Sequence, residues 1–268
     1  MKKILTILVV IIILVIASLF LIKNNSDIGS VNGETIRVGY IIYPPSLQKD
    51  PVTGQFSGFS YDIVEAVADK LGLETKWTEE VGWGTAIEGL KTQRYDVLGT
   101  QMWPTEARKK EVLFSIAPMD SISYAYVRKG DTRFNNDLSM LNSNQYIISV
   151  LDGEITASIA QEDFPNARTL ALPQLSSFAE VFLNVVQKKA DITFAEPSAV
   201  EDFLASNPNT LDRVSGEPVR AFGNSFAFNK NDAEIVEKWN KAIQELIDDG
   251  TIRKILEKHG VENYYRIN

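Results

Sequence analysis

The sequence predicts an α/β protein of two lobes, preceded by an apolar N-terminal segment. Strand patterns alternate with helix patterns, first from about residue 35 and again from about residue 146. Such alternation favours mostly parallel sheets with helices packed on their faces. Two alternating blocks in a chain of 268 residues indicate two lobes with a cleft between them. Ligands of open α/β sheets bind beyond the carboxyl ends of the strands, so the cleft is the expected site.

The first block consists of short apolar runs separated by turns rich in Gly and Pro. Ser60 is placed to N-cap its first helix, and Gly72 is placed to end that helix. Strands are expected at 35–40, 74–78, 95–99 and 121–127, and helices at 60–71 and 85–91.

The second block repeats the alternation and closes with two helices. The longer of these has Ile235, Trp239, Ile243 and Leu246 on one face, which is the spacing of an amphipathic helix. Strands are expected at 146–150, 190–194 and 225–228, and helices after Gly153 and at 178–188, 198–205, 233–248 and 252–258.

The composition excludes several classes of function. A net charge of −8 argues against nucleic acid as a partner, because phosphate backbones need a basic surface. The chain has no cysteine, which rules out disulfides, thiol nucleophiles and cysteine metal sites. It has one histidine, no cluster of metal-ligating residues and no glycine-rich phosphate loop. We therefore expect no nucleic-acid partner, no cofactor, no metal site and no catalytic residue.

Residues 1–23 are expected to be a signal sequence or membrane anchor, and residues 24–34 a polar linker. Met1-Lys2-Lys3 precedes an apolar run, residues 4–22, which nearly spans a hydrocarbon core of about 30 Å. Lysines on the short N-terminal side keep that end in the cytoplasm. The run exceeds the apolar region of a usual signal peptide and lacks a small-residue cleavage site, which favours a retained anchor. The remaining chain would be extracytoplasmic, periplasmic or at the cell surface, and tethered to the cytoplasmic membrane, or secreted if the segment is cleaved.

The stretch from Gly99 to Arg108 has the composition of a loop that holds a ligand. It follows a short apolar strand and ends on a guanidinium, which binds a carboxylate bidentately. Thr105 is placed to N-cap the helix that carries Arg108. The alternative is an exposed arginine that opens the charged run Arg108-Lys109-Lys110. The position of Arg108 just after a loop at a strand end favours the binding role.

The motifs after the linker run in a characteristic order. They are Val38-Gly39 with Tyr43-Pro44-Pro45, Gly58-Phe59-Ser60-Tyr61-Asp62-Ile63, Trp83 with Gly89-Leu90, Asp96 with Thr105-Glu106-Ala107-Arg108, Ala190-Asp191-Ile192 with Glu196, and Glu245 to Thr251. In this order and spacing the chain resembles extracytoplasmic solute-binding protein family 3, the substrate-binding proteins of polar amino-acid ABC transporters. The resemblance covers nearly everything after residue 34.

The resemblance implies a two-lobed, type II periplasmic-binding-protein-like fold with two hinge strands. Lobe one would comprise residues 35–120 and 225–268, and lobe two residues 121–224. The hinges would lie near 120–124 and 222–225, and the lobes would close around a ligand. The resemblance also implies a monomer whose partners are a small amino-acid-like ligand and an ABC transporter permease, with the membrane contacted through the N-terminal helix.

The same resemblance places the contacts to the ligand's carboxylate on the loop described above. Arg108 stands at the position of the arginine that binds this carboxylate. Thr100 and Gln101 match positions that offer it a hydroxyl or backbone groups. Trp103 replaces a small polar residue, so it would narrow the pocket or add a ring wall.

The remaining contacts implied by the resemblance are two aromatics and an acid. Tyr43 and Trp83 match the rings that sandwich the aliphatic part of the ligand, and stacked rings also attract cations. Glu196 matches the position of an aspartate that binds the ligand's ammonium. A structural alternative for Glu196 is an acidic residue that favours the start of a helix before Pro197.

The class of ligand is left open by one departure from the family pattern. Glu154 and Ile155 stand where small hydroxyl residues are common. An inward Glu154 would repel a carboxylate, so either it turns outward or the ligand is more cationic than a neutral amino acid. In contrast, Tyr40-Ile41-Ile42 supplies no acid for a basic side chain, which favours a neutral or apolar amino acid.

The resulting hypothesis is an extracytoplasmic protein that binds an amino acid or related small zwitterion and delivers it to an ABC importer. One alternative is an enzyme resembling cyclohexadienyl (prephenate or arogenate) dehydratases, in which Glu196 would act as an acid. Another alternative is a ligand-sensing module that acts through a partner chain.

Overall fold

The computed structural model describes residues 35–135 and 137–267. The expected signal sequence or anchor at 1–23 and the expected linker at 24–34 lie outside these residues. Within the described part, no helix combines the length and the apolar character that crossing a bilayer requires.

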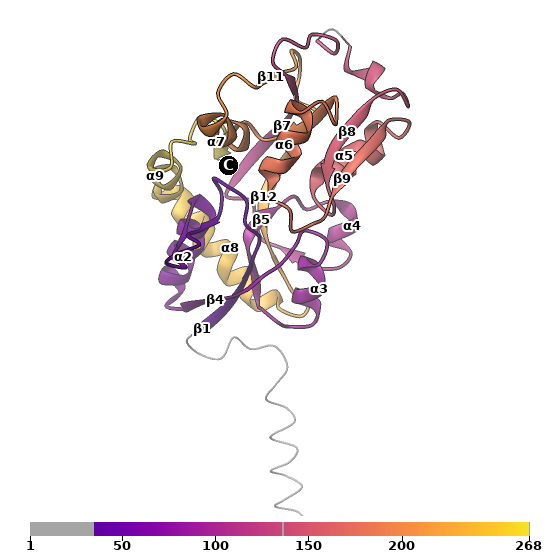
Figure 1. The fold of residues 1–268 in the computed structure, drawn as a ribbon. Helices are drawn as coiled ribbons and strands as arrows, with labels where there is room; N and C mark the ends of the chain where they lie inside the picture. Colours follow the sequence, from indigo (N-terminus) through magenta and orange to yellow (C-terminus); the bar gives the residue numbers. More distant parts are fainter. Residues whose placement is uncertain (1–34, 136, 268) are drawn as a thin grey trace, which may run out of the picture. The chain divides into compact units, whose positions relative to one another are not determined.

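Strands and helices follow each other in nearly the predicted order (Figure 1). The strands are β1 (Thr35–Tyr40), β2 (Gln48–Lys49), β3 (Phe56–Ser57), β4 (Glu74–Glu80), β5 (Val97–Met102), β6 (Leu113–Phe114), β7 (Met119–Arg128), β8 (Ile147–Leu151), β9 (Arg168–Leu172), β10 (Ile192–Ala195), β11 (Leu211–Arg213), β12 (Arg220–Phe228) and β13 (Arg266–Ile267). The helices are α2 (Phe59–Leu71), α3 (Ala86–Lys91), α4 (Glu106–Lys109), the 3-10 helix η1 (Leu138–Leu141), α5 (Ile155–Asp163), α6 (Phe178–Val186), α7 (Pro197–Ser206), α8 (Ala233–Asp248) and α9 (Thr251–Lys258).

The main sheet runs in the order β4-β1-β5-β12-β7-β10-β8-β9. We call β4, β1 and β5, with α2, α8 and α9, the first lobe, and β10, β8 and β9, with α5 and α6, the second lobe. Strand β1 is parallel to β4 and β5, and β8 is parallel to β9 and β10. The predicted two-lobed α/β fold with mostly parallel sheets is confirmed.

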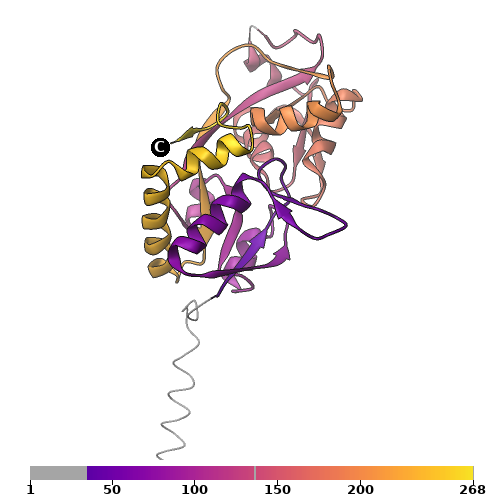
Figure 2. The same ribbon diagram turned by 90° about the vertical axis from the view of Figure 1, so that its left-hand side faces the viewer.

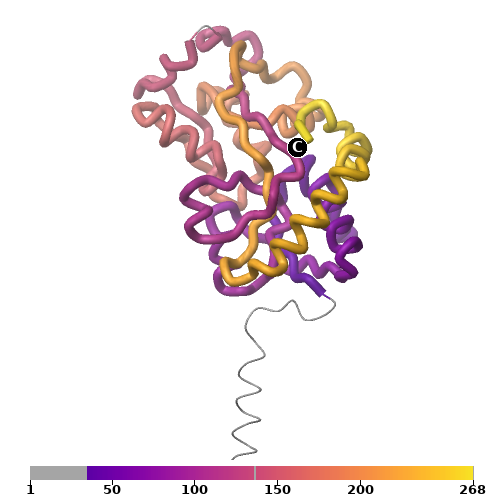
Figure 3. The backbone as a smooth tube through the Cα atoms, turned by 180° about the vertical axis from the view of Figure 1, so that it is seen from behind, coloured from indigo at the N-terminus to yellow at the C-terminus, as the bar shows by residue number. Residues whose placement is uncertain are grey.

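Strands β7 and β12 join the two lobes. They pair antiparallel from Arg220↔Ser123 to Asn224↔Met119, and Figure 3 shows them side by side. Beyond this pairing, β12 continues against β5, and β7 continues against β10 and β11. The hinges expected near 120–124 and 222–225 fall on this pairing, so the expected lobe boundaries cut through two strands.

Helices α2, α8 and α9 gather on one side of the first lobe (Figure 2). Helix α8 buries Val236, Trp239, Ile243 and Leu246, and the Trp239 ring, fully buried, contacts the rings of β12. Removing such apolar surface from water is the main force that holds the helix on the sheet. The predicted amphipathic helix at 233–248 is confirmed.

The start of α2 differs from the prediction. The helix begins at Phe59 with Gly58 as N-cap, and the Ser60 hydroxyl instead bonds Ser46 and Gln101 inside the protein. Gly58 has φ 113°, and a Cβ there would lie 2.3 Å from the carbonyl oxygen of Ser46, so only glycine fits. The predicted helix end at Gly72 is confirmed by its left-handed conformation.

Strand β5 also differs, because it extends to Met102. The expected strand ended at Gly99 and was followed by a loop, but Thr100 and Gln101 lie in the strand. The extension pairs with β12, where Ser225 lies opposite Met102. The partner strand is more than a hundred residues away in sequence, so the local pattern could not indicate it.

Candidate ligand-binding site

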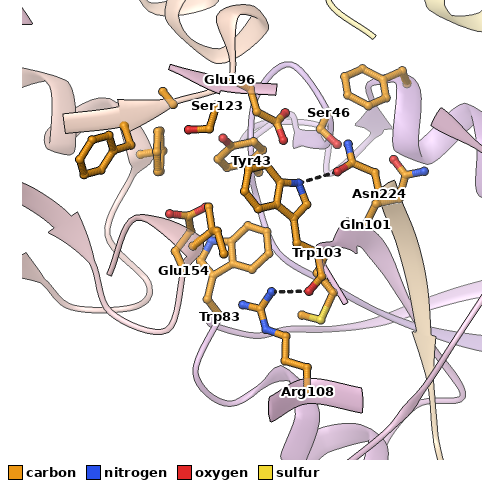
Figure 4. A pocket seen from close by; sticks show the side chains of 16 residues that line it. Tyr43, Ser46, Trp83, Gln101, Trp103, Arg108, Ser123, Glu154, Glu196 and Asn224 are labelled. Carbon is orange, nitrogen blue, oxygen red and sulfur yellow. Dashed lines mark hydrogen bonds between the residues drawn. The ribbon is translucent and has the colours of Figure 1, made fainter. Parts of the chain in front are cut away.

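A buried pocket lies between the two lobes, beyond the carboxyl end of β5 (Figure 4). Its cavity measures about 30 Å³, room for one or two water molecules. An amino acid therefore enters only when the lobes separate or the pocket side chains change conformation. The lining residues are Tyr43, Ser46, Phe59, Trp83, Gln101, Met102, Trp103, Arg108, Ser123, Glu154, Ile155, Phe178, Phe194, Ala195, Glu196 and Asn224.

Arg108 lies at one end of the pocket and bridges the two lobes. The hydroxyl of Thr105 caps α4 by accepting a hydrogen bond from the backbone N–H of Arg108, as predicted. The guanidinium donates from Nη1 to the carbonyl oxygen of Trp103 and from Nη2 to that of Gly153, each at 2.9 Å. Burial lowers the pKa of Arg108, and nearby Glu154 raises it. The guanidinium is thus held by neutral acceptors that a carboxylate could replace.

Glu196 lies at the other end of the pocket, between β10 and α7. Its Oε1 accepts a hydrogen bond from the Ser121 hydroxyl at 2.7 Å, and its Oε2 accepts one from the Tyr265 hydroxyl at 2.9 Å. Burial raises the pKa of Glu196 to about 6; these hydrogen bonds lower it, and Glu154 raises it. Glu196 is also the N-cap residue of α7, so the position expected for a helix start and the position in the pocket coincide.

Glu154 lines the pocket and is only 5% exposed. Its carboxylate caps α5 by accepting a hydrogen bond from the backbone N–H of Thr156 at 2.7 Å. Burial raises the pKa of Glu154, while the bond from Thr156 and the charge of Arg108 lower it. The side chain therefore turns neither outward to solvent nor freely inward, because the helix start holds it in the pocket wall.

Aromatic rings form the walls between the two charged ends. The rings of Tyr43 and Trp83 meet edge to face, with centroids 5.7 Å apart, and Tyr43 meets Phe178 of the second lobe at 5.1 Å. The Trp103 indole N–H lies 2.8 Å from Asn224 Oδ1 and 2.9 Å from Ser121 Oγ, which fixes this ring. Trp103 is one of the lining residues.

Six of the seven predicted site residues come together in this pocket: Tyr43, Trp83, Gln101, Trp103, Arg108 and Glu196. Thr100 is not among the lining residues. Its hydroxyl bonds both backbone groups of Ile41, accepting from the N–H at 2.9 Å and donating to the carbonyl at 2.7 Å. The extension of β5 explains this placement, because neighbouring residues of a strand face opposite ways.

Two polar side-chain atoms in the pocket have no hydrogen-bond partner among the described residues. These are Gln101 Nε2 and Ser123 Oγ. Gln101 Oε1 accepts from the Ser60 hydroxyl at 3.0 Å, which orients the amide. Buried polar groups are normally paired, so both atoms are available to a ligand.

Sequence reasoning missed several lining residues. Ser123 shares a face of β7 with Ser121, and their spacing of two residues is the only local signal for it. Ser46, Phe178 and Asn224 reach the pocket through tertiary contacts without a motif of their own. In the described part of the chain, no group of three metal-ligating side chains could hold a metal ion.

Comparisons with known proteins point to one family. The family model of the bacterial extracellular solute-binding proteins, family 3, matches residues 36–262. The L-cystine-binding protein TcyA of Bacillus subtilis (strain 168) is 25% identical over 219 residues, which cover 81% of this chain and 77% of TcyA.

Two solved structures share the fold. An ancestral arginine-binding protein bound to arginine has a TM-score of 0.75 and 26% identity, with 84% of this chain and 98% of that chain covered. The ancestral amino acid-binding protein AncCDT-1, described as a precursor of cyclohexadienyl dehydratase, has a TM-score of 0.72 and 28% identity, with 84% and 94% covered.

Proposed function

Because the chain belongs to the bacterial extracellular solute-binding proteins, family 3, we propose that it binds an amino acid outside the cytoplasm and delivers it to an ABC importer. The observation that carries the proposal is the pair of opposite charges in one buried pocket. Arg108 and Glu196 lie at opposite ends of the pocket, with aromatic walls between them. This arrangement complements the carboxylate and the ammonium of an amino acid.

The ligand class follows from the charges of the lining. Two carboxylates, those of Glu154 and Glu196, face one guanidinium. Burial disfavours the charged form of both acids, and a cationic group of the ligand would favour that form again. A second cation on the ligand would also balance the excess of one negative charge in the lining. We therefore expect an amino acid with a cationic side chain to bind more tightly than a neutral one. The relative bound to arginine supports this order, and the L-cystine-binding relative supports the broader class.

A thermal-shift panel followed by calorimetry on the purified chain tests the proposal. The panel contains L-arginine, L-lysine, L-glutamine, L-leucine, L-cystine, prephenate and arogenate. A ligand at about 100 times its Kd adds about 2.7 kcal/mol to the free energy of unfolding, which such a scan resolves. Arg108→Ala should weaken binding roughly 30-fold or more, because it removes the cation proposed to pair with the ligand's carboxylate. Lys110→Ala, an exposed cation two residues away, is the matched control. Equal affinity of the two variants for every binder would contradict the proposed role of Arg108.

A dehydratase activity is a second candidate, favoured by the buried carboxyl of Glu196. Its pKa of about 6 is nearer to neutral pH than that of an ordinary glutamate, so roughly a tenth of the carboxyl is protonated at pH 7 and can serve as a general acid. The structural relative described as a precursor of cyclohexadienyl dehydratase supports testing it. Turnover of prephenate or arogenate by the wild type and its absence in Glu196→Gln would establish this activity. Binding of amino acids without such turnover would exclude it.

The oligomeric state, the membrane attachment and the transporter partner of the protein belong to the same proposal. We infer that the chain acts as a monomer, that residues 1–23 tether it to the cytoplasmic membrane and that an ABC permease receives its ligand. The apolar run at 4–22 and the preceding lysines support the tether. Light scattering after gel filtration of the detergent-solubilised chain tests the monomer, and a dimer mass would contradict it.

A further inference from the structure

We propose that Tyr265, from the segment after α9, is a positioning residue of the ligand site that orients the carboxylate of Glu196 toward the ligand's ammonium. The inference rests on the proposed function and deepens it. Tyr265 lies almost at the end of the chain, and no motif of the sequence pointed to it. It acts on the ligand through Glu196, and it is not among the residues that line the cavity.

The segment that carries Tyr265 is fixed to both lobes and to the hinge. The Tyr265 ring is 7% exposed and packs on Phe59, a lining residue of the first lobe, with ring centroids 5.1 Å apart. The next residues form β13, which pairs with the hinge strand β7 at Asp120 and Met119. Figures 1 and 3 show the C-terminus beside α7 and the crossing strands. The hydroxyl is therefore presented to Glu196 by a segment that ring packing and strand pairing hold in place.

The hydrogen-bond directions single out Tyr265 among the partners of Glu196. Ser121 has one hydroxyl proton but two acceptors, Glu196 Oε1 at 2.7 Å and Asn224 Oδ1 at 2.9 Å. The Asn224 oxygen is fixed as an acceptor because the Trp103 indole can only donate to it. Ser121 must therefore divide its single proton between two acceptors.

Tyr265 has no such conflict. An ionised Glu196 only accepts, so the Tyr265 hydroxyl donates to Oε2 at 2.9 Å. The second contact of that hydroxyl, to Ser198 Oγ at 2.8 Å, is then a bond donated by Ser198. A donor behind Tyr265 polarises its hydroxyl and strengthens the bond to Glu196. The chain Ser198–Tyr265–Glu196 thus holds one carboxylate oxygen in place and favours the ionised form that an ammonium needs.

The other charged and titratable groups near Glu196 do not replace this donor. Glu154 raises the pKa of Glu196. Burial is the main cause that raises the pKa of Tyr43 above its ordinary value, and the charge of Glu196 is the next largest cause. Tyr265 itself stays protonated, because burial and the charge of Glu196 raise its pKa. Loss of the Tyr265 hydroxyl should consequently raise the pKa of Glu196 further, since a bond to the charged form is removed.

The test compares Tyr265→Phe with Tyr264→Phe in the full chain. Both variants lose one phenol hydroxyl from the same segment, but Tyr265→Phe keeps the ring that packs on Phe59. Binding of L-arginine is measured by calorimetry from pH 5 to pH 8.5. In Tyr265→Phe the pH at half-maximal affinity should rise by about one unit. Affinity at pH 6 should fall several-fold, and the two affinities should approach each other at pH 8.5.

A merely structural role would weaken binding at every pH without moving that midpoint. The proposal is overturned if the midpoint is unchanged in Tyr265→Phe, or if Tyr264→Phe moves it equally. Ser198→Ala removes the donor behind Tyr265 and should move the midpoint in the same direction by less. This second variant keeps the inference testable if Tyr265→Phe folds poorly.

A second readout separates this inference from the proposed function. In protein labelled with ¹³C at the glutamate carboxyl carbons, the Glu196 signal is assigned by its loss in Glu196→Gln and titrated without any ligand. A higher pKa of Glu196 in Tyr265→Phe supports the contact even if no amino acid binds. An unchanged pKa refutes it even if binding is found.

Discussion

The guanidinium of Arg108 in the first lobe donates a hydrogen bond to the carbonyl oxygen of Gly153 in the second lobe at 2.9 Å. At the same place Gly153 lies against Gly84 of the first lobe, where a Cβ on Gly153 would come within 2.4 Å of the Gly84 nitrogen. The residue proposed to bind the ligand's carboxylate therefore also joins the two lobes. Ligand binding and lobe closure are expected to be coupled through this contact.

Gly153→Ala should weaken amino-acid binding, because the added Cβ keeps the loops apart. Gly153 has φ 78°, so part of the effect is backbone strain of about 1 kcal/mol. Gly130→Ala is the matched control, since Gly130 has φ 79° and nothing within 4 Å of its Cβ position. Calorimetry and thermal unfolding should show similar losses of stability in both variants but a loss of affinity in Gly153→Ala alone. Equal ligand affinities of Gly153→Ala and Gly130→Ala would show that the close contact between Gly153 and Gly84 does not matter for binding.

The stability of Glu196→Gln relative to the wild type should increase as the pH rises from 5 to 7.5. The same variant should bind amino acids more weakly. The folded-state pKa of about 6 exceeds the ordinary value of 4.5, so the folded protein binds this proton more tightly than the unfolded chain. That contribution is complete below pH 4.5 and is lost as the pH rises through 6, at a cost of about 2 kcal/mol. Urea unfolding of both proteins across this range measures the difference. A difference that does not vary with pH would contradict the raised pKa.

Thr100→Ala should lower stability and leave the ligand affinity nearly unchanged. The hydroxyl of Thr100 satisfies two buried backbone groups of Ile41, and leaving them unpaired costs about 1–3 kcal/mol. Gln101→Ala should instead lower the ligand affinity, because its amide nitrogen has no partner in the described part of the protein. It should also cost some stability, since the bond that its amide oxygen accepts from Ser60 is lost. Urea unfolding and calorimetry on the two variants distinguish the roles. A large loss of affinity in Thr100→Ala would restore the direct contact that the resemblance implied.

Deletion of residues 1–23 should move the protein from the membrane fraction to the soluble fraction. The apolar run at 4–22 supplies the proposed anchor, and the chain has no cysteine that could carry a lipid instead. Fractionation of cells that express the full chain and the deletion measures this. Mass spectrometry of the mature N-terminus complements it, because a full chain found without residues 1–23 would show a cleaved signal.

The sequence by itself determined the order of elements, the family and most of the candidate site. Local signals were sufficient for features that neighbouring residues determine. These are the alternation of strands and helices, the amphipathic face of α8, the Thr105 cap and the motif around Arg108. These features depend on residues close together in the chain, so spacing alone reveals them.

Only the tertiary structure decided where strand β5 ends, what the hydroxyls of Ser60 and Thr100 bond, and how Glu154 lies. It also brought Ser123 and Asn224 to the pocket and placed the Tyr265 hydroxyl against Glu196. Each of these depends on a partner from a distant segment: β12 for the extended strand, the hinge strands for Ser123 and Asn224, and the C-terminal segment for Tyr265. A buried polar group forms its hydrogen bond with whichever neighbour the fold brings close, and the local sequence does not reveal that neighbour.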